Sequence, residues 1–286
     1  MKSSLDRFFE ELSSPKRSLV VVNNSKPKPL VRMVENTFEH QSIDVSETNP
    51  EGTDDDVVVL LSDEGSERKV IATSPLEALE ETVLLVNSDL YRTGTAGFSE
   101  GDLPDVLAGL EEVPFRLRGY PHSNKEKLLL IVMSRFVERR AFERGSGRLR
   151  TSFQRLSRIH DERGTAEVYR TLGRSDVQTH VYGVPDGLPP EEFSLVSHAG
   201  YTEEFRRSWF VVHTPPDHRT ENMGGSTVDA MEDGEGDGRE HLREGDRGSS
   251  HAALLALETA PRRWKGFWTF RPSLVREIDE YVARNL

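Results

Sequence analysis

The sequence contains no cysteine, few lysines and no long uncharged apolar run. The missing cysteine and the missing apolar run each exclude particular kinds of site or segment. Without cysteine, the chain has no disulfides, no thiolate nucleophile, no cysteine-bound zinc and no thioether-linked chromophore. The longest apolar stretch, residues 128–133, is followed at once by Arg135 and Glu138, so it is too interrupted for a membrane span. The N-terminal residues are charged early and lack an apolar core, which predicts no signal peptide. We therefore expect a soluble cytoplasmic protein.

The charge balance is strongly acidic. There are 49 acidic and 37 basic residues, which gives a formal net charge of −12, and arginine supplies most of the positive charge. A uniformly acidic surface argues against general binding of nucleic acid or of anionic membranes. An acid excess with scarce lysine is also typical of proteins from a high-salt cytoplasm, where screening weakens self-repulsion. This hypothesis predicts folding that depends on salt, and a salt titration tests it.

The length of 286 residues suits one large or two modest domains. Strand and helix patterns alternate in the first part of the chain, and several strands followed by a last helix, 273–284, make up the second. We therefore expect an α/β fold in which an N-terminal α/β subdomain, residues 1–120, packs on a C-terminal α+β domain, residues 121–286. The C-terminal domain should contain a mixed sheet and a central buried helix. Residues 217–250 are rich in Asp, Glu and Gly and are predicted to form a disordered acidic insertion.

The predicted central helix covers residues 125–144 and is apolar on nearly every side in its first half. At about 100° per residue, Arg135, Glu138 and Arg139 share one side with apolar residues. Two interpretations remain open: an ion pair on a half-exposed helix, or a partly buried charge cluster that faces a ligand or a bistable contact. The glycine-flanked turn that follows carries cations and can cradle an anion. Residues 153–159 continue with helical spacing.

Catalytic motifs are missing from the sequence. It contains no metalloprotease, nucleophile-elbow, dinucleotide-binding or kinase motif, and its histidines show no metal-ligand spacing. His160 and Asp161 are adjacent, and adjacent side chains on a helix diverge. The three tryptophans are explained either as core or rim aromatics or as walls that stack on a ligand: Trp209, Trp264 and Trp268. The sequence thus names no metal and no cofactor.

Five segments carry recognisable motifs: residues 134–141, SRFVERRA; 145–154, GSGRLRTSFQ; 180–186, HVYGVPD; 208–212, SWFVV; and 266–270, GFWTF. In combination they resemble the DICT sensory domain, whose helix reads Ser-Arg-x-Ile-Glu-x-Arg-Ala and is followed by a Gly-x-Gly-x-Leu-x-x-x-Phe-Gln segment. The resemblance covers about residues 85–286. The N-terminal part is similar to stand-alone members from halophilic archaea, which agrees with the acidic composition.

The resemblance implies a signal-input protein. Such domains accompany diguanylate cyclases and two-component proteins, so the implied partners are signalling proteins such as histidine kinases or regulators, with a role in light or environmental responses. The family has no established catalytic residues, so none is carried over, and we expect a protein that is not an enzyme. The chain departs from the family pattern in having no recognisable output domain and in carrying the acidic insertion.

We therefore predict a sensor that binds an unidentified small ligand or a partner and relays a conformational change. The ligand site is expected between the central helix and the closing strands. Its predicted lining residues are Arg135, Glu138, Arg139, Arg148, Gln154, Tyr182, Trp209 and Trp268. Two alternatives stay open: an enzyme acting on nucleotides or phosphate esters, and a transcriptional regulator. The regulator would use the arginine run Arg148, Arg150, Arg155, Arg158 and Arg163.

Overall fold

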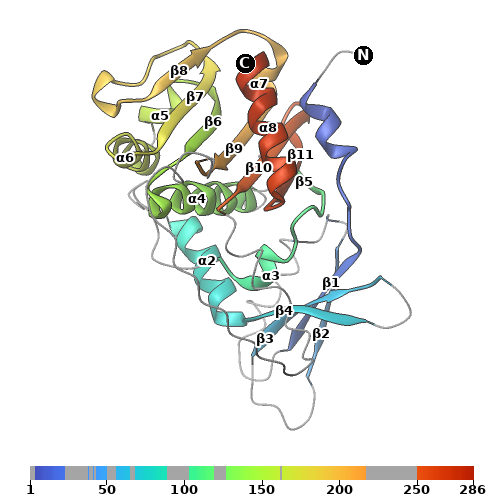
Figure 1. The fold of residues 1–286 in the computed structure, drawn as a ribbon. Coiled ribbons are helices and arrows are strands. Elements are labelled where there is room, and N and C mark those ends of the chain that lie inside the picture. Colours follow the sequence, from blue (N-terminus) through green and yellow to red (C-terminus); the bar gives the residue numbers. More distant parts are fainter. Residues whose placement is uncertain are drawn as a thin grey trace, which may run out of the picture.

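The computed structural model describes residues 4–22, 38, 41, 43–49, 56–64, 68–88, 103–118, 127–161, 163–216 and 250–286. Within these ranges the chain forms two mixed β-sheets and several helices (Figure 1), so the predicted α/β class is confirmed. The predicted acidic insertion lies outside the described residues, except for Ser250. The predicted domain boundary at residue 120 also falls in a part of the chain that is not described.

The smaller sheet has four strands in the order β2-β1-β3-β4. Strand β1 is parallel to β2 and antiparallel to β3, and β3 is antiparallel to β4. Continuous runs of Val and Leu in β1 and β3 supply the inward side chains, as expected for strands with a buried face. The bounds are Arg17–Val22 for β1, Ile43–Thr48 for β2, Val57–Ser62 for β3 and Lys69–Pro75 for β4.

The larger sheet has seven strands in the order β5-β11-β10-β9-β6-β7-β8. Strands β6, β7 and β8 are parallel to one another, and the other neighbouring pairs are antiparallel. The last three strands of the chain, β9, β10 and β11, are sequential antiparallel neighbours and form a meander. The bounds are Phe115–Arg118, Arg148–Arg155, Gln178–Val184, Val196–Ala199, Ser208–Thr214, Ala252–Ala260 and Arg263–Thr269 for β5 to β11.

The helices cover both faces of the larger sheet. Helix α4 passes between the two sheets, and helix α8 lies on the opposite face of the larger sheet (Figure 1). The α-helices are α2, Leu76–Ser88; α3, Asp105–Ala108; α4, Lys127–Arg144; α5, Arg158–Asp161; α6, Arg163–Leu172; α7, Glu203–Arg207; and α8, Pro272–Asn285. Two short 3-10 helices are η1, Leu5–Phe9, and η3, Glu191–Phe193. None of the described helices combines the length and the apolar character that crossing a membrane requires.

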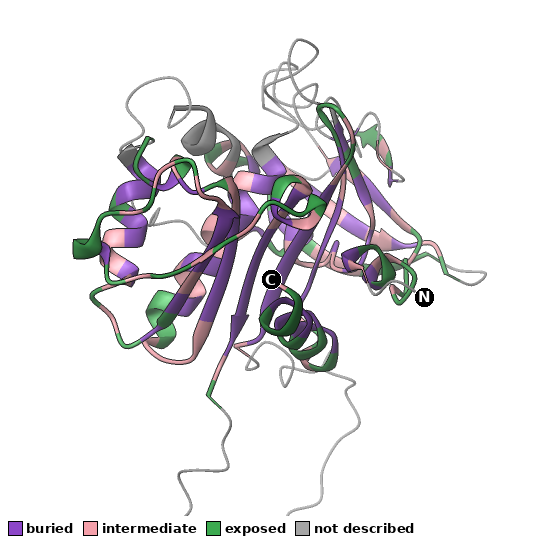
Figure 2. Ribbon diagram, turned by 90° about the horizontal axis from the view of Figure 1, so that it is seen from above, coloured by how far each residue is buried: buried purple, intermediate pink, exposed green. Residues whose placement is uncertain are grey.

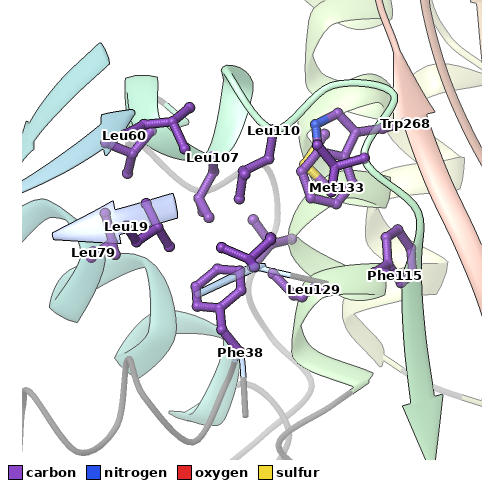
Figure 3. Close-up of a cluster of buried hydrophobic side chains, with 14 of the residues drawn as sticks. Leu19, Phe38, Leu60, Leu79, Leu107, Leu110, Phe115, Leu129, Met133 and Trp268 are labelled. Atoms are coloured by element: carbon purple, nitrogen blue, oxygen red, sulfur yellow. The ribbon is translucent and has the colours of Figure 1, made fainter. Parts of the chain in front are cut away.

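A single hydrophobic cluster joins the two sheets through α4. It includes Leu19 and Leu60 of the small sheet, Leu129 and Met133 of α4, and Trp268 of the large sheet (Figure 3). Figure 2 shows that burial continues along the middle strands of the large sheet. Helix α4 is therefore the buried central helix that the sequence predicts, and its side chains bring the N-terminal and C-terminal parts into one core.

One element differs from the prediction. The interpretation of residues 153–159 as a helical continuation is wrong, because residues 148–155 form strand β6 and helix α5 begins only at Arg158. The turn before β6 explains the glycines. Gly145 and Gly147 have φ values of +64° and +96°, and a Cβ atom on Gly147 would lie 2.5 Å from the carbonyl oxygen of Thr214. Glycine at 147 therefore lets β6 start close to the end of β9.

Candidate functional site

The first polar cluster lies beneath α4 and joins it to α6. Arg135 donates to a Glu138 oxygen at 2.7 Å and to the hydroxyl of Thr165 at 3.0 Å, and the Tyr169 hydroxyl donates to the other Glu138 oxygen at 2.6 Å. We call these four residues the α4 cluster. The Arg135 and Glu138 side chains are only 17% and 3% exposed. The charges are thus enclosed and paired inside the protein, between the two helices.

Burial dominates the electrostatics of the α4 cluster. It raises the pKa of Tyr169 well above the usual value, and the neighbouring Glu138 carboxylate raises it further by its charge and by accepting a hydrogen bond from the phenolic O–H. A neutral phenol that donates to a buried carboxylate is therefore the stable form. A carboxylate held between a guanidinium and a phenol has its hydrogen-bonding capacity met from inside the protein, which is typical of a structural network.

The two tryptophans also contribute to packing on the α4 side. Trp209 donates its indole N–H to the Ser134 hydroxyl at 3.0 Å, and Trp268 is 2% exposed, with its ring centroid 5.4 Å from that of Phe115. Their surroundings are the hydrophobic cluster shared with α4. The structure places both at the interface between the helix and the sheet, where they fill space.

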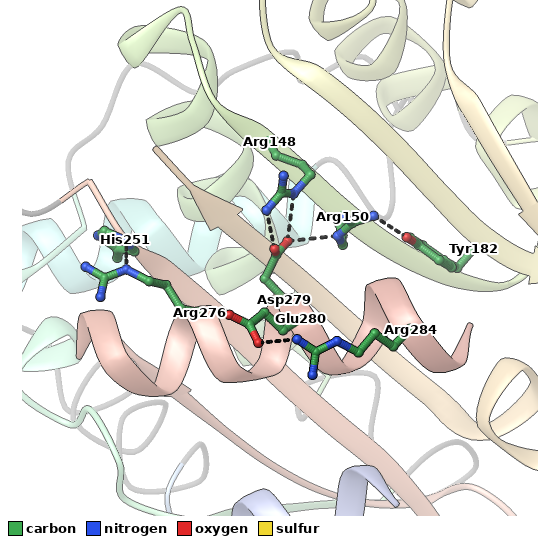
Figure 4. Close-up of polar contacts among 8 residues, drawn as sticks. All are labelled: Arg148, Arg150, Tyr182, His251, Arg276, Asp279, Glu280 and Arg284. Atoms are coloured by element: carbon green, nitrogen blue, oxygen red, sulfur yellow. Dashed lines mark hydrogen bonds and ion pairs between the residues drawn. The ribbon is translucent and has the colours of Figure 1, made fainter. Parts of the chain in front are cut away.

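A second polar cluster lies on the opposite face of the large sheet, beneath α8 (Figure 4). Arg148 makes two hydrogen bonds to Asp279 of α8, one of them from Nε at 3.1 Å. Arg150 donates to the same carboxylate at 2.8 Å and to the Tyr182 hydroxyl at 2.5 Å. Arg150 and Asp279 are buried, with side-chain exposures of 8% and 3%, whereas Arg148 is 36% exposed.

Two histidines extend this arrangement to the edge of the sheet. Nδ1 of His180 and Nε2 of His198 are 2.9 Å apart, and the His198 ring stacks on Tyr182 with the centroids 4.3 Å apart and the planes inclined by 6°. Burial lowers the pKa of His180 to about 4, helped by the positive charge of Arg150, and the same causes lower the pKa of His198. We call Arg148, Arg150, His180, Tyr182, His198 and Asp279 the α8 cluster.

The register of the strands explains why these side chains meet. Arg150 pairs with His180, Ser152 with Tyr182, and Tyr182 with His198, so the alternate residues of β6, β7 and β8 point to the same face. Asp279 comes from the other end of the chain. It lies on the buried stripe of α8 and faces β6.

The eight predicted site residues do not line one space. Glu138, Arg135, Trp209 and Trp268 lie on the α4 side, whereas Arg148 and Tyr182 lie on the α8 side, with the sheet between them. Arg139 pairs with Glu143 at 2.6 Å on the same helix. Gln154 donates to the Arg206 carbonyl and accepts from Arg158 at the end of β6. Their role in ligand binding stays a prediction.

Sequence reasoning did not include Arg150, His180, His198 or Asp279 in the predicted ligand site, and it named Arg150 only in the arginine run of the regulator alternative. A signal for Asp279 was available, because it interrupts the apolar stripe of the predicted last helix, where an acidic residue needs a partner. His198 gave no signal, since its partner is contributed by a different strand. Among the described residues, no group of three or more His, Asp or Glu is placed to hold a metal ion.

Comparison with known proteins gives one finding. Residues 106–221 match the family described as "Sensory domain in DIguanylate Cyclases and Two-component system", abbreviated DICT. No curated protein matches the chain, and no solved structure matches it. The matched range runs from α3 through β9, so it contains the whole α4 cluster and every member of the α8 cluster except Asp279. The resemblance to the DICT sensory domain that the sequence motifs predict is therefore confirmed for residues 106–221.

Proposed function

We propose that this protein is a cytoplasmic signal-input protein in which a small ligand or a partner acts on the α8 cluster and displaces helix α8. The carrying observation is that Asp279 of α8, outside the matched range, is bound by two arginines of β6 inside it. Helix α8 is thus coupled to the sensory region by charge as well as by packing.

The energetics favour such a coupling. Asp279 and Arg150 are almost fully buried, and a buried ion pair is costly to break because one charge is left uncompensated in a medium of low polarity. Arg148 is the exposed member, so an external molecule reaches it first. Two states of α8 are then in equilibrium, one with the Arg148–Asp279 contact and one without it. A ligand that binds the second state more tightly shifts the equilibrium towards it, by as much as its affinities for the two states differ.

Helix α8 also provides a surface for a signalling partner. The face that points away from the sheet carries exposed charged residues of both signs, Arg276, Glu277, Glu280 and Arg284. Histidine kinases and regulators are the partner class that the family description supports. We propose that a partner reads the position of this face, in a response to light or another environmental signal and in a cytoplasm of high salt concentration.

The two other functions receive less support from the described residues. Arg148 and Arg150 point at Asp279, and Arg155 pairs with Asp186 at 3.5 Å. These three arginines lie on strand β6, so they form no positive helix face for DNA. Tyr169 and Glu138 are an acid–base pair within hydrogen-bond reach, which an enzyme needs, but both are buried in the core. A sensory role therefore explains more of the arrangement.

Hydrogen–deuterium exchange of α8 tests the proposal. A melting screen and native mass spectrometry with small metabolites and purified two-component proteins would first identify a binder. We expect that binder to change the exchange of amides 272–285, and Asp279→Asn to abolish this response. Glu280→Gln is the matched control, because Glu280 lies on the same helix, is exposed to solvent and pairs with exposed Arg284. Binding without any change at α8 would contradict the relay.

A further inference from the structure

The α8 cluster forms a corner between the sheet and α8. On this face, β6 contributes Arg148 and Arg150, β7 contributes His180, and β8 contributes His198. Helix α8 covers β9 and β10 rather than β7 and β8. His180 and His198 are partly exposed, and Val196, which pairs with His180, is 49% exposed. The histidines and the outer part of Arg148 are therefore accessible from the same side.

The charges in this corner are unequal. Besides the neighbouring His198, the charged groups that act on His180 are Arg150, Arg148 and Asp279, two cations and one anion, and Arg150 is the charged group that acts on His198. Tyr182 is uncharged, so it does not offset the positive charge of the two arginines. Helix α7, which also contacts β7, directs its Glu204 to the hydroxyl of Tyr281 on α8 at 2.7 Å. The corner is thus locally positive on a chain whose net charge is −12.

His180 and His198 are joined by one hydrogen bond, which the two neutral rings can form. The ring centroids are 5.2 Å apart and the planes are inclined by only 21°, so the 2.9 Å contact is an N–H···N hydrogen bond between nearly coplanar rings. This bond needs one protonated and one lone-pair nitrogen facing each other. Protonation of both facing nitrogens would break it, and any proton added to the pair places a cation beside Arg150.

We propose that Arg148, His180 and His198 bind a small oxyanion, the phosphate or carboxylate group of the ligand, in this corner. The inference rests on the proposed function, because it names the ligand class of the same site. The anion takes over part of the Arg148 hydrogen bonding from Asp279, while the buried Arg150 keeps its contact with that carboxylate. Guanidinium and imidazole N–H groups are suitable donors for an oxyanion. Loss of the Arg148 contact is then the step that loosens α8.

Anion binding and proton uptake are linked at such a site. Negative charge beside His180 and His198 offsets the repulsion from Arg150 and raises their pKa values towards the ordinary range. Binding is therefore tighter at lower pH. The pH dependence separates this site from an ordinary arginine contact, whose affinity is constant over the same range because arginine stays protonated.

Sulfate is the probe, because it keeps two negative charges across the tested range. Calorimetry on the full chain, with potassium chloride replaced by potassium sulfate at constant ionic strength, should give a dissociation constant about tenfold lower at pH 5.5 than at pH 7.5. Arg148→Gln should weaken binding at least about tenfold. The double variant His180→Gln, His198→Gln should keep residual binding and lose its pH dependence.

Arg158→Gln is the matched control, because Arg158 is an exposed arginine that pairs with Gln154 away from α8. It should bind sulfate as the wild type does, and histidine NMR resonances should shift on binding in both. Sulfate binding no tighter than chloride binding, or equal loss in Arg148→Gln and Arg158→Gln, would overturn the inference. If sulfate does not bind but Asp279→Asn still abolishes the ligand-induced change in exchange of α8, the proposed anion site is wrong. The proposed coupling between the ligand and α8 is then still supported.

Discussion

The two faces of the seven-stranded sheet carry polar clusters of similar chemistry and different accessibility. The α4 cluster joins Arg135 to residues about thirty positions away and is closed over by α6. The α8 cluster joins residues 131 positions apart and stays open at Arg148. Both place arginine, carboxylate and tyrosine together, so residue type does not distinguish them. Solvent access does, and it suggests that the first holds the fold together while the second can respond to a ligand.

The largest predicted effect comes from removing Asp279. Asp279→Ala leaves Arg148 and the buried Arg150 without their shared carboxylate, and we expect a loss of about 3–5 kcal/mol in the free energy of unfolding. Urea unfolding followed by circular dichroism measures it. A loss below about 1 kcal/mol would show that the α8 cluster contributes little to holding α8, and the comparison between the two faces would fail.

The two tyrosines give a matched test of the two faces. Tyr169→Phe removes a donor to a buried carboxylate and should cost about 1.5–3 kcal/mol. Tyr182→Phe should cost less, about 0.5–1.5 kcal/mol, because Arg150 keeps its contact with Asp279. Urea midpoints of the two variants decide the order. The reverse order would mean that the open cluster, and not the enclosed one, is the more structural.

Acid should weaken the α8 side in particular. Because burial and Arg150 lower the folded-state pKa of His180 to about 4 from the ordinary 6.5, the unfolded chain binds more protons between these values. The stability contributed by the neutral histidine is present above about pH 6.5 and is lost as the pH falls towards 4. The double variant His180→Gln, His198→Gln should show a flatter fall in urea midpoint. If the urea midpoint of the double variant falls with pH as steeply as that of the wild type, the two histidines do not cause the loss of stability in acid.

The smallest predicted effect tests an exposed pair on α8 itself. Glu280 and Arg284 are spaced four residues apart and are 58% and 75% exposed (Figure 4). Such pairs contribute about 0.3–0.5 kcal/mol, so Glu280→Gln should change the unfolding free energy by no more than that. A loss comparable with that of Asp279→Ala would show that the α8 surface is sensitive everywhere, and the control would lose its value.

Much of the fold follows from local patterns. The buried central helix and the last helix are predicted within a few residues, because each has an apolar pattern that matches its structure. Strand β6 is different. Its arginines occupy inward positions, which in an isolated pattern indicate a solvated segment. The partners that Asp279 and Tyr182 provide make that burial favourable.

The candidate site was predicted only in part. Arg148 and Tyr182 were identified as polar and aromatic lining, but the expected neighbours on the central helix lie across the sheet. Which face a strand residue points to depends on strand order, and β6 lies between β9 and β7, an order that is not sequential along the chain. Contacts that depend on such long-range pairing leave no local signal in the sequence. Local patterns therefore cannot predict which of these residues lie on the α4 face and which on the α8 face.

Strands β9 and β10 are direct neighbours in the sheet, with His213 opposite Ala252, although 38 residues lie between these two in the sequence. A link between adjacent antiparallel strand ends needs only a short turn. The fold therefore sets no fixed length for this connection, and a fluorescent reporter or an affinity tag could be inserted there with the hydrogen-bond register on either side unchanged.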